Sequence, residues 1–149
     1  MTMTMGASTT SRVSPASEAW SLIFELMHLS KRRFMAIASE FELSPPQVMA
    51  LRLLDPDEPK PMSELAAALR CDNSNVTGIV DRLEDRGLVE RRPGERDRRV
   101  KMLSITERGA QIRAQLGARL GEPPEPLANL SVDDQRALRD IMRRALGRA

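Results

Sequence analysis

A short polar segment, residues 73–82 with the sequence NSNVTGIVDR, carries side chains that can contact a nucleic acid. Asparagine amides can pair bidentately with adenine, and serine and threonine hydroxyls can contact bases or phosphates. An arginine one helical turn further along is suited to a backbone phosphate. These residue types single out a set of candidates for contact with double-stranded DNA: Asn73, Ser74, Asn75, Thr77, Gly78 and Arg82.

The same segment has the spacing of an amphipathic helix, which Gly87 is well suited to close. Its apolar residues recur at i, i+3, i+4 and i+7, which places them on one face: Val76, Ile79, Val80 and Leu83. Gly78 falls on the opposite face, where glycine costs about 1 kcal/mol relative to alanine. The missing side chain would let the helix approach the floor of a DNA groove. Two plainer interpretations stay open: Asp72, Asn73 and Ser74 only cap the helix, and Gly78 has no role.

A second polar segment, residues 90–101 with the sequence ERRPGERDRRVK, is strongly basic. It holds six Lys or Arg against three acids, whereas the whole chain has a formal net charge of only +2. Pro93 and Gly94 favour a turn between short β-type runs, which predicts a β-hairpin with a basic tip. Such a tip can reach the DNA backbone or a narrow minor groove, although a solvated surface is the alternative. The candidate residues here are Arg96, Asp97, Arg98 and Arg99.

The pattern before the polar helix predicts three further helices. A long amphipathic helix is expected over 16–41, because its apolar residues recur at three- and four-residue steps. A second helix should begin after Ser44, which can cap it and is followed by two prolines, and should end near Asp55. Residues 55–61 are expected to form a loop, and 63–69 a short helix of high propensity.

The pattern after the polar helix predicts the hairpin and two more helices. Strands are expected over 88–92 and 99–105. A helix capped by a threonine should cover about 106–120, and residues 121–126 should interrupt it before a last helix that follows Ser131. The predicted fold class is therefore mainly α with a small β-hairpin wing. It consists of a winged helix-turn-helix core and a helical dimerisation region.

The composition excludes several classes of protein. Cys71 is the only cysteine and His28 the only histidine, so an internal disulfide and a conventional zinc site are excluded. The sequence has no paired catalytic groups, phosphate loop or metal set, and we expect no enzyme activity and no cofactor. No apolar run approaches the roughly 18 residues of a membrane span. Residues 1–16 have the character of a disordered tail, so we expect a cytoplasmic protein without a membrane partner.

Residues 62–109 closely resemble the winged-helix core of MarR-type transcriptional regulators, and 43–54 resemble the family's second helix more loosely. The similarity is carried by Val76-Thr77, Val80-Asp81-Arg82-Leu83-Glu84, Gly87-Leu88-Val89-Glu90-Arg91, Asp97-Arg98-Arg99, Leu103, Thr106 and Gly109. The resemblance implies a homodimer that binds a near-palindromic DNA operator and represses a nearby operon. It also implies that the N-terminal helix and the last two helices form the dimer interface.

The resemblance further implies roles for individual residues. In the family, the wing arginine of a D-x-R pattern enters the minor groove, which corresponds to Arg99, with Asp97 as the acid that orients it. The plainer interpretation is a local ion pair that stabilises the hairpin, worth less than about 1 kcal/mol if exposed, and both roles can coexist. Repression in the family is relieved by a small, often aromatic ligand. Candidate pocket residues for such a ligand are Trp20, Phe24, Met27, His28 and Met49, although a helical aromatic stripe can equally be core.

The expected organisation has four parts: a disordered tail over 1–16, the first dimerisation helix over 17–43, the DNA-binding core over 44–105 and the C-terminal dimerisation helices over 106–149. Two alternative functions stay open. The hairpin of a winged-helix interaction module could meet an acidic protein partner. A redox-responsive regulator could act through Cys71, since a helix N-terminus can lower the pKa of a thiol, although a small buried residue is the plainer interpretation.

Overall fold

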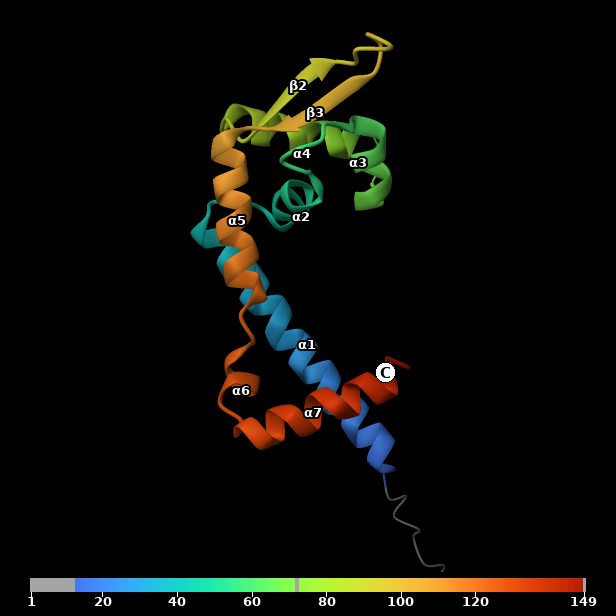
Figure 1. The fold of residues 1–149 in the computed structure, drawn as a ribbon, viewed down its shortest axis with the longest axis vertical. Helices are drawn as coiled ribbons and strands as arrows, with labels where there is room; N and C mark the ends of the chain where they lie inside the picture. Colours follow the sequence, from blue (N-terminus) through green and yellow to red (C-terminus); the bar gives the residue numbers. More distant parts are fainter. Residues whose placement is uncertain (1–12, 72, 149) are drawn as a thin grey trace, which may run out of the picture. The chain divides into compact units, whose positions relative to one another are not determined.

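The computed structural model describes residues 13–71 and 73–148 (Figure 1). Along the chain lie α1 (Pro15–Glu40), α2 (Pro45–Leu53), β1 (Lys60–Pro61), α3 (Met62–Leu69), α4 (Asn73–Asp85), β2 (Val89–Pro93), β3 (Lys101–Ile105), α5 (Glu107–Gly121), α6 (Glu125–Ala128) and α7 (Val132–Ala145). The chain divides after Arg32 into two compact units, which are described separately. The predicted fold class, mainly α with a small β-hairpin wing, is confirmed.

The start of α2 follows the predicted capping chemistry. The Ser44 hydroxyl accepts a hydrogen bond from the Gln47 main-chain N–H at 3.4 Å, and the Ser44 N–H donates to the Gln47 side-chain oxygen at 3.0 Å. This reciprocal capping box satisfies two main-chain donors that a helix start would otherwise leave without partners. Pro45 and Pro46 carry no N–H and therefore add no unpaired main-chain donor to the first turn of α2.

The end of α4 is closed by Gly87, as predicted. Its φ of 69° lies in the left-handed region that glycine adopts without a steric penalty. The Gly87 N–H donates to the Glu84 carbonyl at 2.8 Å, and the Leu88 N–H donates to the Leu83 carbonyl at 2.9 Å. This pair of hydrogen bonds is the Schellman arrangement. It ends the helix and turns the chain directly into β2.

The sheet has the order β1-β3-β2 and is antiparallel throughout. The predicted hairpin is confirmed, with Val89 opposite Ile105 and Pro93 opposite Lys101; we call this hairpin, residues 89–105, the wing. The prediction of a loop over 55–61 was wrong at its end, because Lys60 and Pro61 form the edge strand β1 against β3. Two residues are too few to show an alternating pattern, and a proline is tolerated on an edge strand.

The segment predicted to interrupt the C-terminal helices also contains structure that the sequence pattern did not reveal. Glu125–Ala128 form α6, a helix of 4 residues whose first turn contains Pro126. One helical turn is too short to display a period of 3.6 residues, so its apolar spacing carried no signal. The last helix begins where predicted, because Ser131 caps α7 by accepting a hydrogen bond from the Asp134 N–H at 3.1 Å.

The core lies between the wing and the helices α2 to α5 (Figure 1). Its largest fully buried side chains come from all of these elements: Val48, Leu51, Leu54, Leu65, Val76, Val80, Leu83, Leu88, Val89, Leu103 and Leu116. Burying one such side chain contributes about 1.5–3 kcal/mol. Val76, Val80 and Leu83 belong to the predicted apolar face of α4, so the buried side of that helix is confirmed.

The apolar stripes predicted on α1 and α7 are not buried within the chain. Among the large apolar side chains of α1 and α7 and of the C-cap of α7, these keep 52% to 62% of their surface exposed: Trp20, Leu22, Phe24, Met27, Met35, Val132, Ile141 and Leu146. In α1, only Ile37 and Ala38 near its end join the core. The tail predicted over 1–16 falls mostly outside the described residues, and α1 already begins at Pro15. Among the described helices, none has both the length and the apolar character needed to cross a membrane.

The first turn of α5 is packed against the junction of α4 and β2. The Thr106 hydroxyl donates to the Gly87 carbonyl at 2.6 Å and accepts from the Gly109 N–H at 3.0 Å, which caps α5 as predicted. A Cβ on Gly109 would lie 2.0 Å from the Leu88 carbonyl oxygen and 2.8 Å from the Ile105 side chain. This close approach leaves no room for any side chain other than hydrogen.

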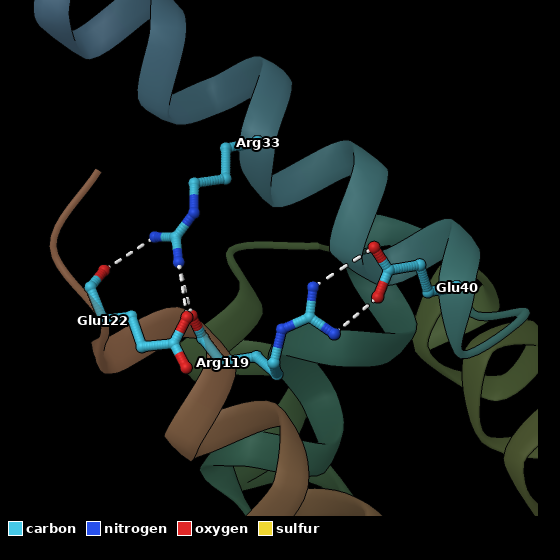
Figure 2. Close-up of polar contacts among 4 residues, drawn as sticks. All are labelled: Arg33, Glu40, Arg119 and Glu122. Carbon is cyan, nitrogen blue, oxygen red and sulfur yellow. Dashed lines mark hydrogen bonds and ion pairs between the residues drawn. The ribbon is translucent and has the colours of Figure 1, made fainter. Parts of the chain in front are cut away.

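The final turns of α1 and α5 are joined by two arginines (Figure 2). The Arg33 guanidinium donates to the Glu122 carbonyl at 2.7 Å and to the Arg119 carbonyl at 2.8 Å, which satisfies carbonyls that the end of α5 would otherwise leave open. Arg119 in turn forms a bidentate pair with the Glu40 carboxylate at 2.6 and 3.2 Å. These hydrogen bonds from Arg119 lower the pKa of Glu40, while partial desolvation opposes the change.

Replacing Gly109 tests the close approach of α5. Gly109→Ala should lower the free energy of unfolding by about 1–3 kcal/mol, because either the Leu88 carbonyl or the whole helix must shift. Gly117→Ala is the matched control in α5, where an added Cβ meets nothing within 4 Å. It should raise the stability by up to about 1 kcal/mol through helix propensity. Urea unfolding measures both, and a similar effect of the two substitutions would contradict the packing described for Gly109.

Replacing Glu40 tests the link between α1 and α5. A carboxylate whose pKa is lowered on folding adds stability above its unfolded pKa and loses it as the pH falls through the folded value. Glu40→Gln should therefore lower the Tm at pH 7 by roughly 1–3 °C. This difference from the parent should shrink below about pH 4.5, the ordinary value for the group. Thermal scans between about pH 3 and pH 7 check this, with Glu95→Gln in the exposed wing tip as the control.

Candidate nucleic-acid interface

The outer side of α4 is a narrow polar surface. Ser74, Asn75, Thr77 and Gly78 are all exposed, as is Arg82 one turn further on. A Cβ added to Gly78 would have no neighbour within 4 Å, so the glycine fills no structural need in the packed chain. The outward orientation expected from the helical period is therefore the observed one. Asn73 is the first residue of α4, whereas the cap role considered for Asp72 lies outside the described residues.

The four candidate residues of the wing are all exposed at its tip: Arg96, Asp97, Arg98 and Arg99. The Asp97 carboxylate accepts a hydrogen bond from the main-chain N–H of Arg99 at 2.9 Å, and the Val100 N–H donates to the Asp97 carbonyl at 3.1 Å. Among the described residues, no ion pair joins Asp97 to Arg99, and the carboxylate instead engages the main chain. Asp97 thus fixes the path of the tip and leaves the Arg99 guanidinium exposed.

The structure brings α4 and the wing together at a shared hollow. Thr77 from α4 and Arg99 from the wing both line this hollow, which has a volume of about 320 Å³. Ser63 at the start of α3 and Lys101 at the start of β3 lie in the same wall. Neither of these two residues was among the sequence candidates. Ser63 belongs to a segment that indicated only a helix, and Lys101 lies at the end of the basic segment, within the second predicted strand.

Arg91 in β2 is a further residue that the sequence candidates missed. Its guanidinium pairs with the Asp81 carboxylate on α4, and its charge lies 3.7 Å from the Glu84 carboxylate. The alternation of side chains along a β-strand could have indicated the direction of the Arg91 side chain. Arg91 is two residues after the buried Val89, so its side chain points to the same face of the hairpin and toward the helix.

The candidate ligand residues fall into both units of the chain. Met49 lines a hollow of about 580 Å³ whose other walls come from α2, α3, α4 and the link between α3 and α4: Pro45, Pro46, Ala68, Leu69, Arg70, Cys71, Asn75 and Ile79. Trp20, Phe24, Met27 and His28 belong to the first unit, where the Phe24 and His28 rings lie 5.2 Å apart. A single pocket formed by all five residues stays a prediction. Cys71 is half-buried in the wall of the hollow and packs against the core, so its interpretation as a small buried residue was partly right.

The combined surface can bind a nucleic acid by two kinds of contact. The outer side of α4 offers amide and hydroxyl groups, and a single helix is narrow enough to enter the major groove of DNA. The wing adds exposed guanidinium groups suited to phosphates or to a minor groove. Both elements lie in the second unit and meet at the hollow that Thr77 and Arg99 share, so they can act as one continuous surface.

Comparison with known proteins gives matches over the same region. The model of the MarR family matches residues 43–101. The HTH-type transcriptional regulator YfiV of Bacillus subtilis is 30% identical over 99 residues, which are 66% of this chain and 62% of that protein. The transcriptional repressor MprA of Escherichia coli K12 is 46% identical over 50 residues, which are 34% of this chain and 28% of that protein. The matches thus span less than two thirds of either relative.

Solved structures share the fold over nearly the whole chain. Wild-type MarR from Escherichia coli in its apo form superposes with a TM-score of 0.73 at 25% identity, covering 91% of this chain and 99% of that one. A mutant of the same MarR complexed with operator DNA gives a TM-score of 0.61 at 24% identity, with coverage of 90% and 99%. Residues 43–101 thus match the model of the MarR family, and most of the chain is similar in fold to solved MarR structures.

Proposed function

We propose that this protein is a homodimeric transcriptional regulator that binds double-stranded DNA sequence-specifically and acts as a repressor. The observation that carries the proposal is the slim, side-chain-poor outer face of α4 beside the exposed arginines of the wing. Support comes from the relatives: MprA is named a transcriptional repressor, and a MarR mutant was crystallised with operator DNA. The proposal makes α4 the recognition helix in the major groove.

The DNA contacts follow from the positions of the side chains. Asn75 and Thr77 project from the outer side of α4, next to the bare surface of Gly78, where base edges would approach the helix. Arg82 lies about one turn beyond Gly78 and is suited to a phosphate of the groove wall. Arg99 extends the contact from the wing, where an arginine fits the negative potential of a narrow minor groove.

Dimer formation is proposed from the apolar surface that the chain leaves exposed. Trp20, Phe24 and Met27 on α1 and Val132, Ile141 and Leu146 on α7 are more than half exposed, which is costly for so many large apolar side chains. A second copy can cover them with the same residues of its own, as a two-fold interface requires. Two recognition helices about 34 Å apart would then meet successive turns of a near-palindromic operator.

Release by a small aromatic ligand is the finer part of the proposal. The hollow of about 580 Å³ lined by Met49 lies in the size range of pockets for small molecules, and most of its walls are apolar. Asn75 of α4 is one of the residues that line this hollow. A ligand bound there would contact the proposed recognition helix directly and could favour a position of that helix that does not fit the groove.

Removing the wing arginine tests the proposed DNA contact. Arg99→Ala should weaken operator binding by about tenfold or more and should reduce the slope of log affinity against log salt by about 1, because one fewer cation meets the DNA. Arg136→Ala on α7 removes an equal charge from an exposed ion pair outside the wing and should change neither quantity. Fluorescence anisotropy at several salt concentrations gives both numbers. Unchanged affinity and slope for Arg99→Ala would remove the wing from the interface.

Substituting Gly78 separates stability from DNA binding. Gly78→Ala should raise the free energy of unfolding by about 0.5–1 kcal/mol, because the added methyl group meets no neighbour and alanine favours the helix. The same methyl group should weaken operator binding, and Gly78→Glu should abolish it through bulk and charge while the dimer stays folded. Gly117→Ala is the control for a glycine exchange that affects stability alone. Full operator affinity in both Gly78 variants would exclude a close approach of α4 to the groove.

A further inference from the structure

One guanidinium in the wing contacts three points along α4. The Arg91 Nη2 donates to the Thr77 carbonyl at 3.3 Å and also to the Asp81 carboxylate. Its Nη1 lies 3.7 Å from the Glu84 carboxylate, and the main-chain N–H of Arg91 donates to the same carboxylate at 3.2 Å. Residues 77, 81 and 84 are spaced i, i+4 and i+7, so they form one line along the side of α4 that faces the strand.

The strand holds Arg91 in this place through its neighbours. Arg91 pairs with the buried Leu103 of β3, and Val89 on the same face of the strand is 1% exposed in the core. The Arg91 side chain is only 23% exposed, whereas the side chains of Asp81 and Glu84 are 52% and 41% exposed. The cation is therefore partly shielded between the wing and the helix, while the two carboxylates face outward beside the recognition surface.

The charge of α4 is unfavourable for the function proposed above. The helix carries three carboxylates, on Asp81, Glu84 and Asp85, against the single cation of Arg82. DNA presents one negative charge for about every 1.7 Å of its axis, so uncompensated carboxylates on a helix in the groove would repel the phosphates. Ion pairing with a fixed arginine reduces this repulsion, because the field of a close pair falls off faster than that of an isolated charge.

We propose that Arg91 is a positioning residue for DNA binding that acts through Asp81 and Glu84. It holds both carboxylates against the wing and cancels much of their charge, so that α4 can enter the groove of the operator. The proposal rests on the function proposed above. It differs from a direct phosphate contact, because the donors of Arg91 are directed at the Thr77 carbonyl and the two carboxylates.

Combining substitutions distinguishes this role from a direct contact. Arg91→Gln should weaken binding by about tenfold or more, because it exposes two carboxylates to the phosphates. Adding Asp81→Asn and Glu84→Gln to Arg91→Gln should restore the affinity to within about threefold of the parent, because the repulsion is gone. The probe is a labelled duplex that the parent dimer selects from a random-sequence pool, measured by anisotropy over a range of salt concentrations.

Three other results would contradict either the role proposed for Arg91 or the proposed DNA binding itself. If the triple variant stays as weak as Arg91→Gln, with a salt slope lowered by about 1, Arg91 touches a phosphate directly and the proposal is wrong. Parent-like affinity of Arg91→Gln would also overturn it. Failure of the parent itself to select any duplex would refute the proposed DNA-binding function, which separates that failure from one limited to Arg91.

A purely structural role is tested by variants that keep the wing in place. Arg91→Lys keeps a cation beside both carboxylates and should retain most of the affinity, even if Arg91→Gln folds poorly. Asp81→Asn in the parent leaves Arg91 beside a single carboxylate, which removes the net negative charge of the cluster. This variant should bind at least as tightly, with a steeper salt slope. A loss of affinity in Asp81→Asn without a change in Tm would contradict the proposal, since removing a carboxylate could then not be favourable for DNA binding.

Discussion

The main chain at Gly109 lies against the Leu88 carbonyl so closely that a single Cβ would stand 2.0 Å from the oxygen. Around this contact, the Thr106 hydroxyl donates to the Gly87 carbonyl, and the Thr106 N–H donates to the Leu88 carbonyl at 3.1 Å. The end of α4, the start of β2, the end of β3 and the start of α5 therefore meet at one point. The approach of Gly109 to Leu88 and the hydrogen bond from the Thr106 N–H involve main-chain atoms, so side-chain rotation alone cannot alter how α5 packs against the α4–β2 junction.

The helix α5 extends this fixed relation to the other end of the second unit. Its first turn is held at the α4–β2 junction, and its last turn receives the Arg33 side chain from α1 and pairs through Arg119 with Glu40 (Figure 2). A displacement of either end of α5 must be accommodated at the other, because the helix between them is continuous and Leu116 in its middle is fully buried. The exposed ion pairs add little stability by themselves, yet they join the last two turns of α1 to the end of α5.

Two opposite demands meet in α4. Its inner face anchors the core through Val76, Val80 and Leu83, whereas the proposed DNA contact requires a slim, polar outer face. Gly78 and the small polar residues around it meet the second demand at a cost in helix propensity. The carboxylates of Asp81 and Glu84 would oppose binding to DNA, and the wing supplies Arg91 beside them. The wing thus has a role at the helix as well as at its own basic tip.

Much of this molecule follows from its sequence, because the signals act over one or two helical turns. The capping Ser44 and Thr106, the closing Gly87 and the apolar period of α4 predicted element types, most boundaries and the outward side of Gly78. Short elements such as β1 and α6 had too few residues for any period to appear. The partners of Arg91, 7 to 14 residues away, and of Arg33, up to 89 residues away, depend on how the strands and helices pack. Only the tertiary structure decided these contacts, since an arginine in a sequence carries its charge but not the position of the groups that it will meet.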